Sequence, residues 1–87
     1  MPRKIRQLKA DLTMSQQHLH YSMVIEWSDE DQAYLVILPE WADSVLMPAT
    51  HGSTYSEAVQ HGLEVLEMLV KDAAKNGEPL PPPKVYA

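Results

Sequence analysis

The stretch "WSDEDQAYLVILPEW", residues 27–41, decides the fold, because it places a polar turn between two strand-like segments. The preceding segment, "YSMVIEW" (21–27), is rich in β-branched and aromatic residues, and the segment "AYLVIL" (33–38) is apolar on both faces. Between them lies "SDEDQ" (28–32), which has about the length of a hairpin loop. The pattern predicts two antiparallel strands joined by a turn.

Three consecutive acids, Asp29, Glu30 and Asp31, lie in this turn and raise the question of a metal site. A catalytic metal ion needs carboxylates from separate elements that converge on it, backed by further ligands. Adjacent side chains at a loop tip instead splay into water. We interpret the three acids as a solvated turn and expect no metal site and no catalytic residue here.

A long helix is predicted from Thr54 to about residue 76. Thr54 with Glu57 three residues later forms a capping box, and Gly77 is the expected C-terminal stop. Between them, apolar residues recur at intervals of three and four, which gives about 22 residues or roughly 33 Å of helix.

The rest of the chain offers weaker signals. Pro39 and Pro48 restrict any third strand to a short one, around residues 45–48 or near 49–51. The segment "GEPLPPP" (77–83) is typical of an extended connector, and residues 84–87 form a tail or a short edge strand. The prediction is an α+β fold, in which a three- or four-stranded sheet with an antiparallel hairpin carries one long helix on one face.

The chain is short and strand 33–38 needs cover on both sides. A chain of 87 residues buries only roughly 60–65% of the surface that its unfolded form exposes, and a strand apolar on both faces is not one that faces water. We therefore expect a homo-oligomer, a dimer or tetramer, unless an N-terminal helix covers the second face. Ile5, Leu8 and Leu12 form a narrow apolar stripe that predicts such a helix from Arg3 to about Met14.

Charge divides the chain into a basic arm and an acidic body. Residues 1–20 carry four basic residues and one acid, a net charge of +3, whereas residues 21–87 carry three lysines and eleven acids, a net charge of −8. An acidic body repels phosphate backbones and attracts basic proteins, so we do not expect the body to bind DNA directly. The short basic arm either touches nucleic acid or only solvates the end of the chain. The chain has no cysteine and no run of about 20 apolar residues, so we expect a cytoplasmic protein without a membrane span.

The histidines and aromatic residues do not predict a catalytic or nucleic-acid site. His18 and His20 alternate without a third ligand, and His51 and His61 fit capping or packing roles. Trp27, Tyr34 and Trp41 have the rings to stack on bases, but they lie in the acidic part of the chain, which favours core or interface packing. No cofactor is expected.

Several motifs, in this order, resemble the HicB family of antitoxin-like proteins, whose domain is similar to a partial RNase H fold. They are the hairpin segment leading into Leu38-Pro39, then Gly52-Ser53-Thr54 with Glu57 and Ala58, and finally Gly77-Glu78-Pro79-Leu80-Pro81. The resemblance covers residues 21–83. Glu40 stands where the family usually has glycine, and we expect a short form of the family without a C-terminal DNA-binding module.

The resemblance implies an antitoxin, not an enzyme, that binds a small HicA-like mRNA-cleaving toxin. The alternatives are a stand-alone oligomeric interaction protein and an RNase H-like nuclease. For a basic toxin, the charge pattern predicts contacts through Asp29, Asp31, Glu40 and Asp43, with Trp41 as a large amphipathic anchor. The alternative is that Trp41 packs internally and the acids only keep the protein soluble.

Overall fold

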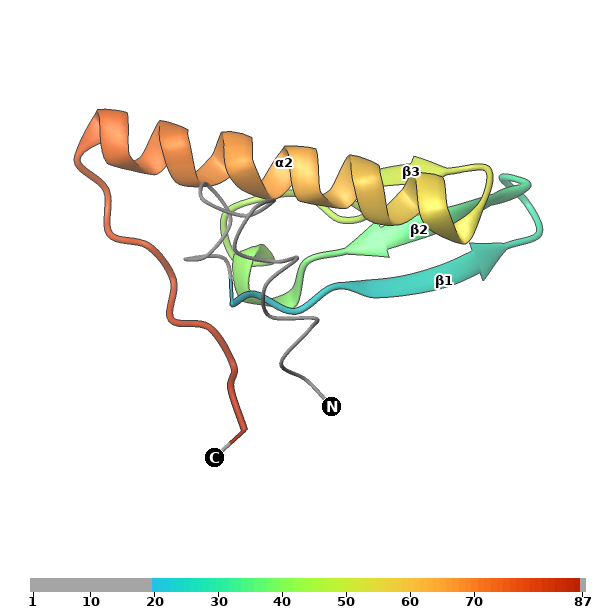
Figure 1. Ribbon diagram of the computed structural model, residues 1–87, viewed down its shortest axis with the longest axis horizontal. Helices are drawn as coiled ribbons and strands as arrows, with labels where there is room; N and C mark the ends of the chain where they lie inside the picture. Colours follow the sequence, from blue (N-terminus) through green and yellow to red (C-terminus); the bar gives the residue numbers. More distant parts are fainter. Residues whose placement is uncertain (1–19, 87) are drawn as a thin grey trace, which may run out of the picture.

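A three-stranded antiparallel sheet and one long helix make up residues 20–86, the part of the chain that the computed structural model describes. The strands are β1 (Val24–Ser28), β2 (Ala33–Ile37) and β3 (Thr50–Gly52), and a short 3-10 helix, η1 (Pro39–Trp41), lies between β2 and β3. Strand order follows chain order, so β2 is central. Helix α2 (Tyr55–Asn76) lies along one face of the sheet (Figure 1). The predicted α+β fold is confirmed, with three strands.

The strand register determines which side chains face α2. Ile25 pairs with Val36, and Trp27 pairs with Tyr34, and directly paired residues lie on the same face of a sheet. Val36 is fully buried on the face covered by the helix. It belongs to the core with four other buried residues: Leu38, Trp41, Ala58 and Leu66.

The opposite face of the sheet is less well covered. Val24 pairs with Ile37 there and is 39% exposed, while Leu35 and Ile37 are half-buried. We expected both faces of segment 33–38 to be covered, and α2 covers one of them. The predicted N-terminal helix lies outside the described residues, and the homo-oligomer stays a prediction.

Two strand boundaries differ from the expected ones. The first strand begins at Val24 and not at Tyr21, because β2 ends opposite Val24 and the Ser22 amide donates instead to the Glu40 carboxylate at 3.1 Å. The Tyr21 hydroxyl donates a hydrogen bond of 2.8 Å to the Pro81 carbonyl. The third strand lies at residues 50–52, close to the second of the two predicted positions. In the tail, residues 84–86 form no strand.

Helix α2 begins and ends as its capping residues predict. The Thr54 hydroxyl accepts a 3.0 Å hydrogen bond from the Glu57 amide, while the Glu57 carboxylate accepts one from Ser53, one residue before the position that an ideal capping box uses. The hydrogen bond from the Ser53 backbone is the main reason that the pKa of Glu57 is lowered. At the other end, Gly77 has φ +69° and the Glu78 amide donates to the Ala73 carbonyl at 2.8 Å, which is a Schellman motif.

The helix packs directly on the backbone of β3 at Gly52. A Cβ atom built on Gly52 would lie 2.8 Å from the Ala58 Cα and closer still to the Ala58 nitrogen. Both of these atoms belong to the helix backbone, so no rotamer change can make room. Because glycine has no side chain, Gly52 therefore lets the helix approach the sheet closely.

We expect Gly52→Ala to destabilise the fold by about 3 kcal/mol or more, because the added methyl group forces α2 away from β3. The measurement is the free energy of unfolding in urea. Gly77→Ala is the matched control: its site has a positive φ but no atom within 4 Å, so it should cost only about 1–2 kcal/mol. Equal losses in the two variants would contradict the close-packing argument.

Candidate partner-binding surface

The hairpin turn holds its acidic side chains at the surface. Ser28 and Asp31 exchange two hydrogen bonds, in which the Ser28 hydroxyl donates to the carboxylate at 3.0 Å and accepts from the Asp31 amide at 3.1 Å. The Gln32 side chain donates to the Asp29 carbonyl at 2.7 Å. These bonds order the turn, and Asp29, Glu30 and Asp31 are all exposed, as predicted for a solvated turn.

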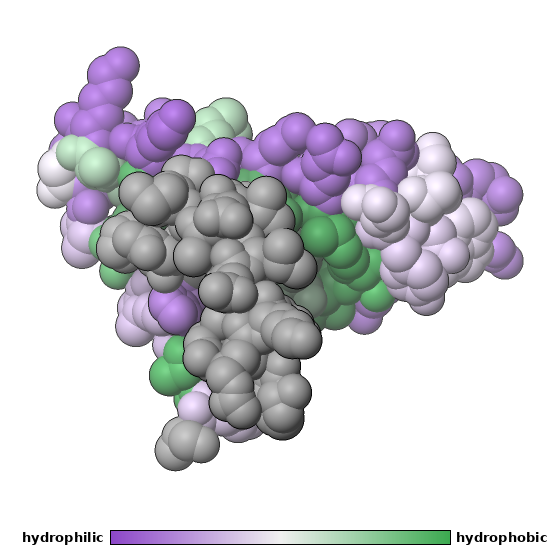
Figure 2. All heavy atoms as spheres, in the orientation of Figure 1, coloured by the Kyte–Doolittle hydropathy of each residue, from purple (hydrophilic) through white to green (hydrophobic). Residues whose placement is uncertain are grey.

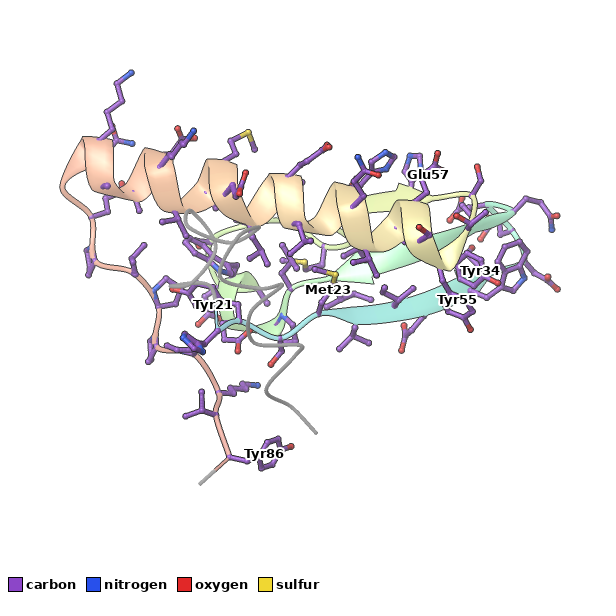
Figure 3. All side chains as sticks on the ribbon, in the orientation of Figure 1. Tyr21, Met23, Tyr34, Tyr55, Glu57 and Tyr86 are labelled. Carbon is purple, nitrogen blue, oxygen red and sulfur yellow. The ribbon has the colours of Figure 1, made fainter. Side chains whose placement is uncertain are left out.

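Next to the turn, three aromatic side chains form a continuous row, here called the aromatic row: Trp27, Tyr34 and Tyr55. The Trp27 and Tyr34 rings meet edge to face with centroids 5.0 Å apart, and the Tyr34 and Tyr55 rings lie 4.3 Å apart. Trp27 is 48% exposed and Tyr55 63% exposed, while Tyr34 between them is half-buried. Figure 3 shows Tyr34 and Tyr55 side by side at the hairpin end of the molecule.

The charge around the aromatic row is negative. Acidic residues lie in the turn and in the first turn of α2: Asp29, Glu30, Asp31 and Glu57. Glu26 of β1 pairs with Leu35 and lies on the opposite face of the sheet. The three lysines of the described residues, by contrast, lie in the C-terminal half of α2 or in the tail: Lys71, Lys75 and Lys84. Figure 2 shows the hairpin end as a pale surface of intermediate hydropathy bordered by hydrophilic residues. This end of the molecule therefore combines exposed rings with negative charge.

Trp41, the predicted anchor, lies in the core. It is 5% exposed and packs edge to face on Tyr21, with ring centroids 5.4 Å apart. Its indole Nε1 is buried and has no hydrogen-bond partner among the described residues. An anchor for a partner would need to be accessible, and Trp41 in this position is not. Residue type alone could not decide this, because a tryptophan is compatible with both a core and an interface role.

Glu40 is engaged in holding the chain together. Its carboxylate accepts hydrogen bonds from the Ser22 amide and hydroxyl at 3.0–3.1 Å, and from the Lys84 amide at 2.9 Å. Partial burial raises the pKa of Glu40, but the hydrogen bonds from Lys84 and Ser22 outweigh it and hold the pKa below its ordinary value. Burial and the Glu40 charge raise the pKa of neighbouring Tyr21. Asp43, three residues further along the chain, is exposed.

The predicted site residues therefore lie in two separate places. Asp29 and Asp31 lie at the hairpin end, whereas Glu40, Trp41 and Asp43 follow the other end of β2, a strand of 5 residues that spans roughly 17 Å. The structure adds Tyr34 and Tyr55 beside the first group. Trp27 and Tyr34 lie at equal distances in sequence from the centre of the turn, so the sequence contains a signal that they pair. Nothing in the sequence indicates that Tyr55 joins them.

The described residues offer no metal centre. No group of three or more His, Asp or Glu side chains in residues 20–86 is arranged to hold a metal ion. The Nδ1 atom of His61 lies 2.6 Å from the His51 carbonyl oxygen, so this ring nitrogen is engaged in a contact with the backbone. Within the same residues, no helix has both the length and the apolar character that crossing a bilayer requires.

Comparisons of the chain with protein-family models, with curated proteins and with solved structures find no match.

Replacing Glu40 by Gln should destabilise the fold by roughly 1 kcal/mol at neutral pH, near the lower end for hydrogen bonds to a charged group, because the carboxylate is in part accessible to water. Since the pKa of Glu40 is lowered on folding, the contribution of its carboxylate to stability is fully present above about pH 4.3, the pKa of an unperturbed Glu. It is lost as the pH falls through the lower pKa of the folded protein.

The measurement is the free energy of unfolding of both proteins between pH 2 and 7. Asp43→Asn is the control, because it removes an exposed charge from the same region without removing these hydrogen bonds. A difference between wild type and Glu40→Gln that persists unchanged at the lowest pH would contradict the role of the carboxylate charge.

Proposed function

We propose that the protein is an antitoxin of a type II toxin-antitoxin system, which binds and neutralises a small HicA-like mRNA-cleaving toxin in the cytoplasm. The observation that carries the proposal is the acidic, aromatic hairpin end, which suits a basic protein partner. A toxin that binds RNA needs a positively charged surface to contact phosphates. Complementary charge speeds the encounter of two proteins and disfavours wrong partners.

The order of motifs from Leu38-Pro39 to the Pro-rich segment 77–83 supports the proposal through its resemblance to HicB-like antitoxins. Their places in the fold are compatible with it: Leu38 is fully buried, Gly52 lies under the helix, and Gly77 ends the helix. On this proposal the protein acts by binding, has no catalytic residues, and needs no cofactor.

A second candidate function is that of a stand-alone, homo-oligomeric interaction protein. The half-exposed apolar face of the sheet, with Val24, Leu35 and Ile37, favours it, because a second copy is one way to cover such a face. The nuclease alternative has no comparable support, since the three hairpin acids are neighbours at a single exposed loop tip.

The direct test is to look for a neighbouring gene that encodes a small basic protein, to mix that protein with this one after purification, and to measure sedimentation and RNA cleavage. We expect a complex heavier than either protein alone and loss of RNA cleavage on its formation. Asp29→Asn combined with Asp31→Asn should slow association several-fold and reduce its salt dependence, because these charges act on the encounter rate.

The matched control is Glu64→Gln combined with Asp72→Asn, which removes the same number of exposed charges from α2. This pair should leave the association rate closer to that of the wild type. If no complex forms and the protein sediments alone as a homo-oligomer, the second candidate function replaces the first.

A further inference from the structure

The aromatic row is more exposed than its structural role requires. Trp27 and Tyr34 are a directly opposed cross-strand pair, and such pairs stabilise hairpins. Tyr55 extends the pair onto the first residue of α2 with 63% of its surface exposed. Large aromatic side chains on a small domain are enriched where proteins bind partners.

A carboxylate is fixed beside the exposed indole. The Trp27 Nε1–H group donates a hydrogen bond of 2.8 Å to Asp29 Oδ1, which places a negative charge at the edge of the ring. That bond uses one oxygen of the carboxylate and leaves the second, Oδ2, for a further donor. The site thus offers an aromatic surface and an adjacent anionic acceptor, both presented by the same hairpin.

An arginine side chain matches both features. A guanidinium group is planar, stacks on aromatic rings, and donates several hydrogen bonds in a geometry that suits carboxylates. An ammonium group is more strongly hydrated and does not stack in this way. A phosphate group is disfavoured, because the surrounding residues carry negative charge and the described lysines lie elsewhere.

We propose that the aromatic row and the Asp29 carboxylate form a docking site for an arginine side chain of a basic protein partner. The partner's identity as a toxin rests on the proposed function, but recognition of arginine does not. The rings supply the stacking surface, and Asp29 pairs with the guanidinium. The other acids of the turn, Glu30 and Asp31, add long-range attraction.

The indole groups of the protein supply an internal control for the test. Trp27 is 48% exposed, whereas Trp41 is 5% exposed and lies in the core. In a nitrogen-15 NMR spectrum each tryptophan gives its own Nε1–H signal, and Trp27→Phe identifies the signal of Trp27. The probe is a short peptide of alternating glycine and arginine, compared with the same peptide containing lysine in place of arginine.

We expect the arginine peptide to shift the Trp27 signal saturably, to leave the Trp41 signal in place, and to bind more tightly than the lysine peptide. Tyr55→Ala and Asp29→Asn should each weaken binding about two- to fivefold, as expected for a cation–π or charge contact at an exposed site. Tyr86→Ala is the matched control, because Tyr86 is fully exposed on the tail, far from the row (Figure 3).

An absent shift, equal affinity for the two peptides, or equal shifts of both indole signals would overturn the proposal. Because Tyr55 and Asp29 are exposed, their variants keep the test valid even if changes at Trp27 destabilise the hairpin. If the adjacent basic protein forms no complex while the arginine peptide still binds, the toxin proposal fails and the docking site stands. If the complex forms with undiminished affinity in both variants, the docking site fails and the antitoxin function stands.

Discussion

The structure depends on the close approach of α2 to β3 over Gly52, where a Cβ atom would lie 2.8 Å from the Ala58 Cα. Because β3 leads into the helix through only two residues, this contact fixes where α2 begins. Gly52 is also the register partner of Tyr34. The same approach that closes the core over Val36 therefore brings the first residue of the helix, Tyr55, onto the Tyr34 ring.

The two ends of the sheet use their carboxylates differently. Glu40 accepts hydrogen bonds from Ser22, 18 positions before it, and from Lys84, 44 positions after it, and so joins the start of the domain to its tail. Because the carboxylate of Glu40 is bonded to these two segments, they limit the access of a partner to it. At the hairpin end, the acids bond only within their own turn or to Trp27, so their charge faces outward. The carboxylate of Glu40 therefore stabilises the fold, whereas the hairpin acids are accessible to a partner.

The parts of the fold that sequence predicts are those with local causes. The hairpin follows from a polar turn between two apolar segments, and the helix from Thr54, Glu57 and Gly77, whose hydrogen bonds join neighbours in the chain. Strand β3 has only 3 residues, and its pairing with β2 depends on distant residues. Likewise, the burial of Trp41 depends on Tyr21, 20 positions away in the sequence. The exposed position of Tyr55 has no local signal at all, so sequence alone could not complete the candidate site.

The distribution of acids bears more on recognition than on stability. Exposed charges add little to the free energy of folding, and like charges held together in one turn repel each other. Electrostatic interactions between exposed groups are screened over about 8 Å at physiological salt. The turn acids are neighbours and act as a unit within that distance, whereas Asp43 lies beyond the opposite end of β2, roughly 17 Å of strand away. A basic partner therefore meets the hairpin acids together with the exposed rings, and Asp43 acts as a separate charge.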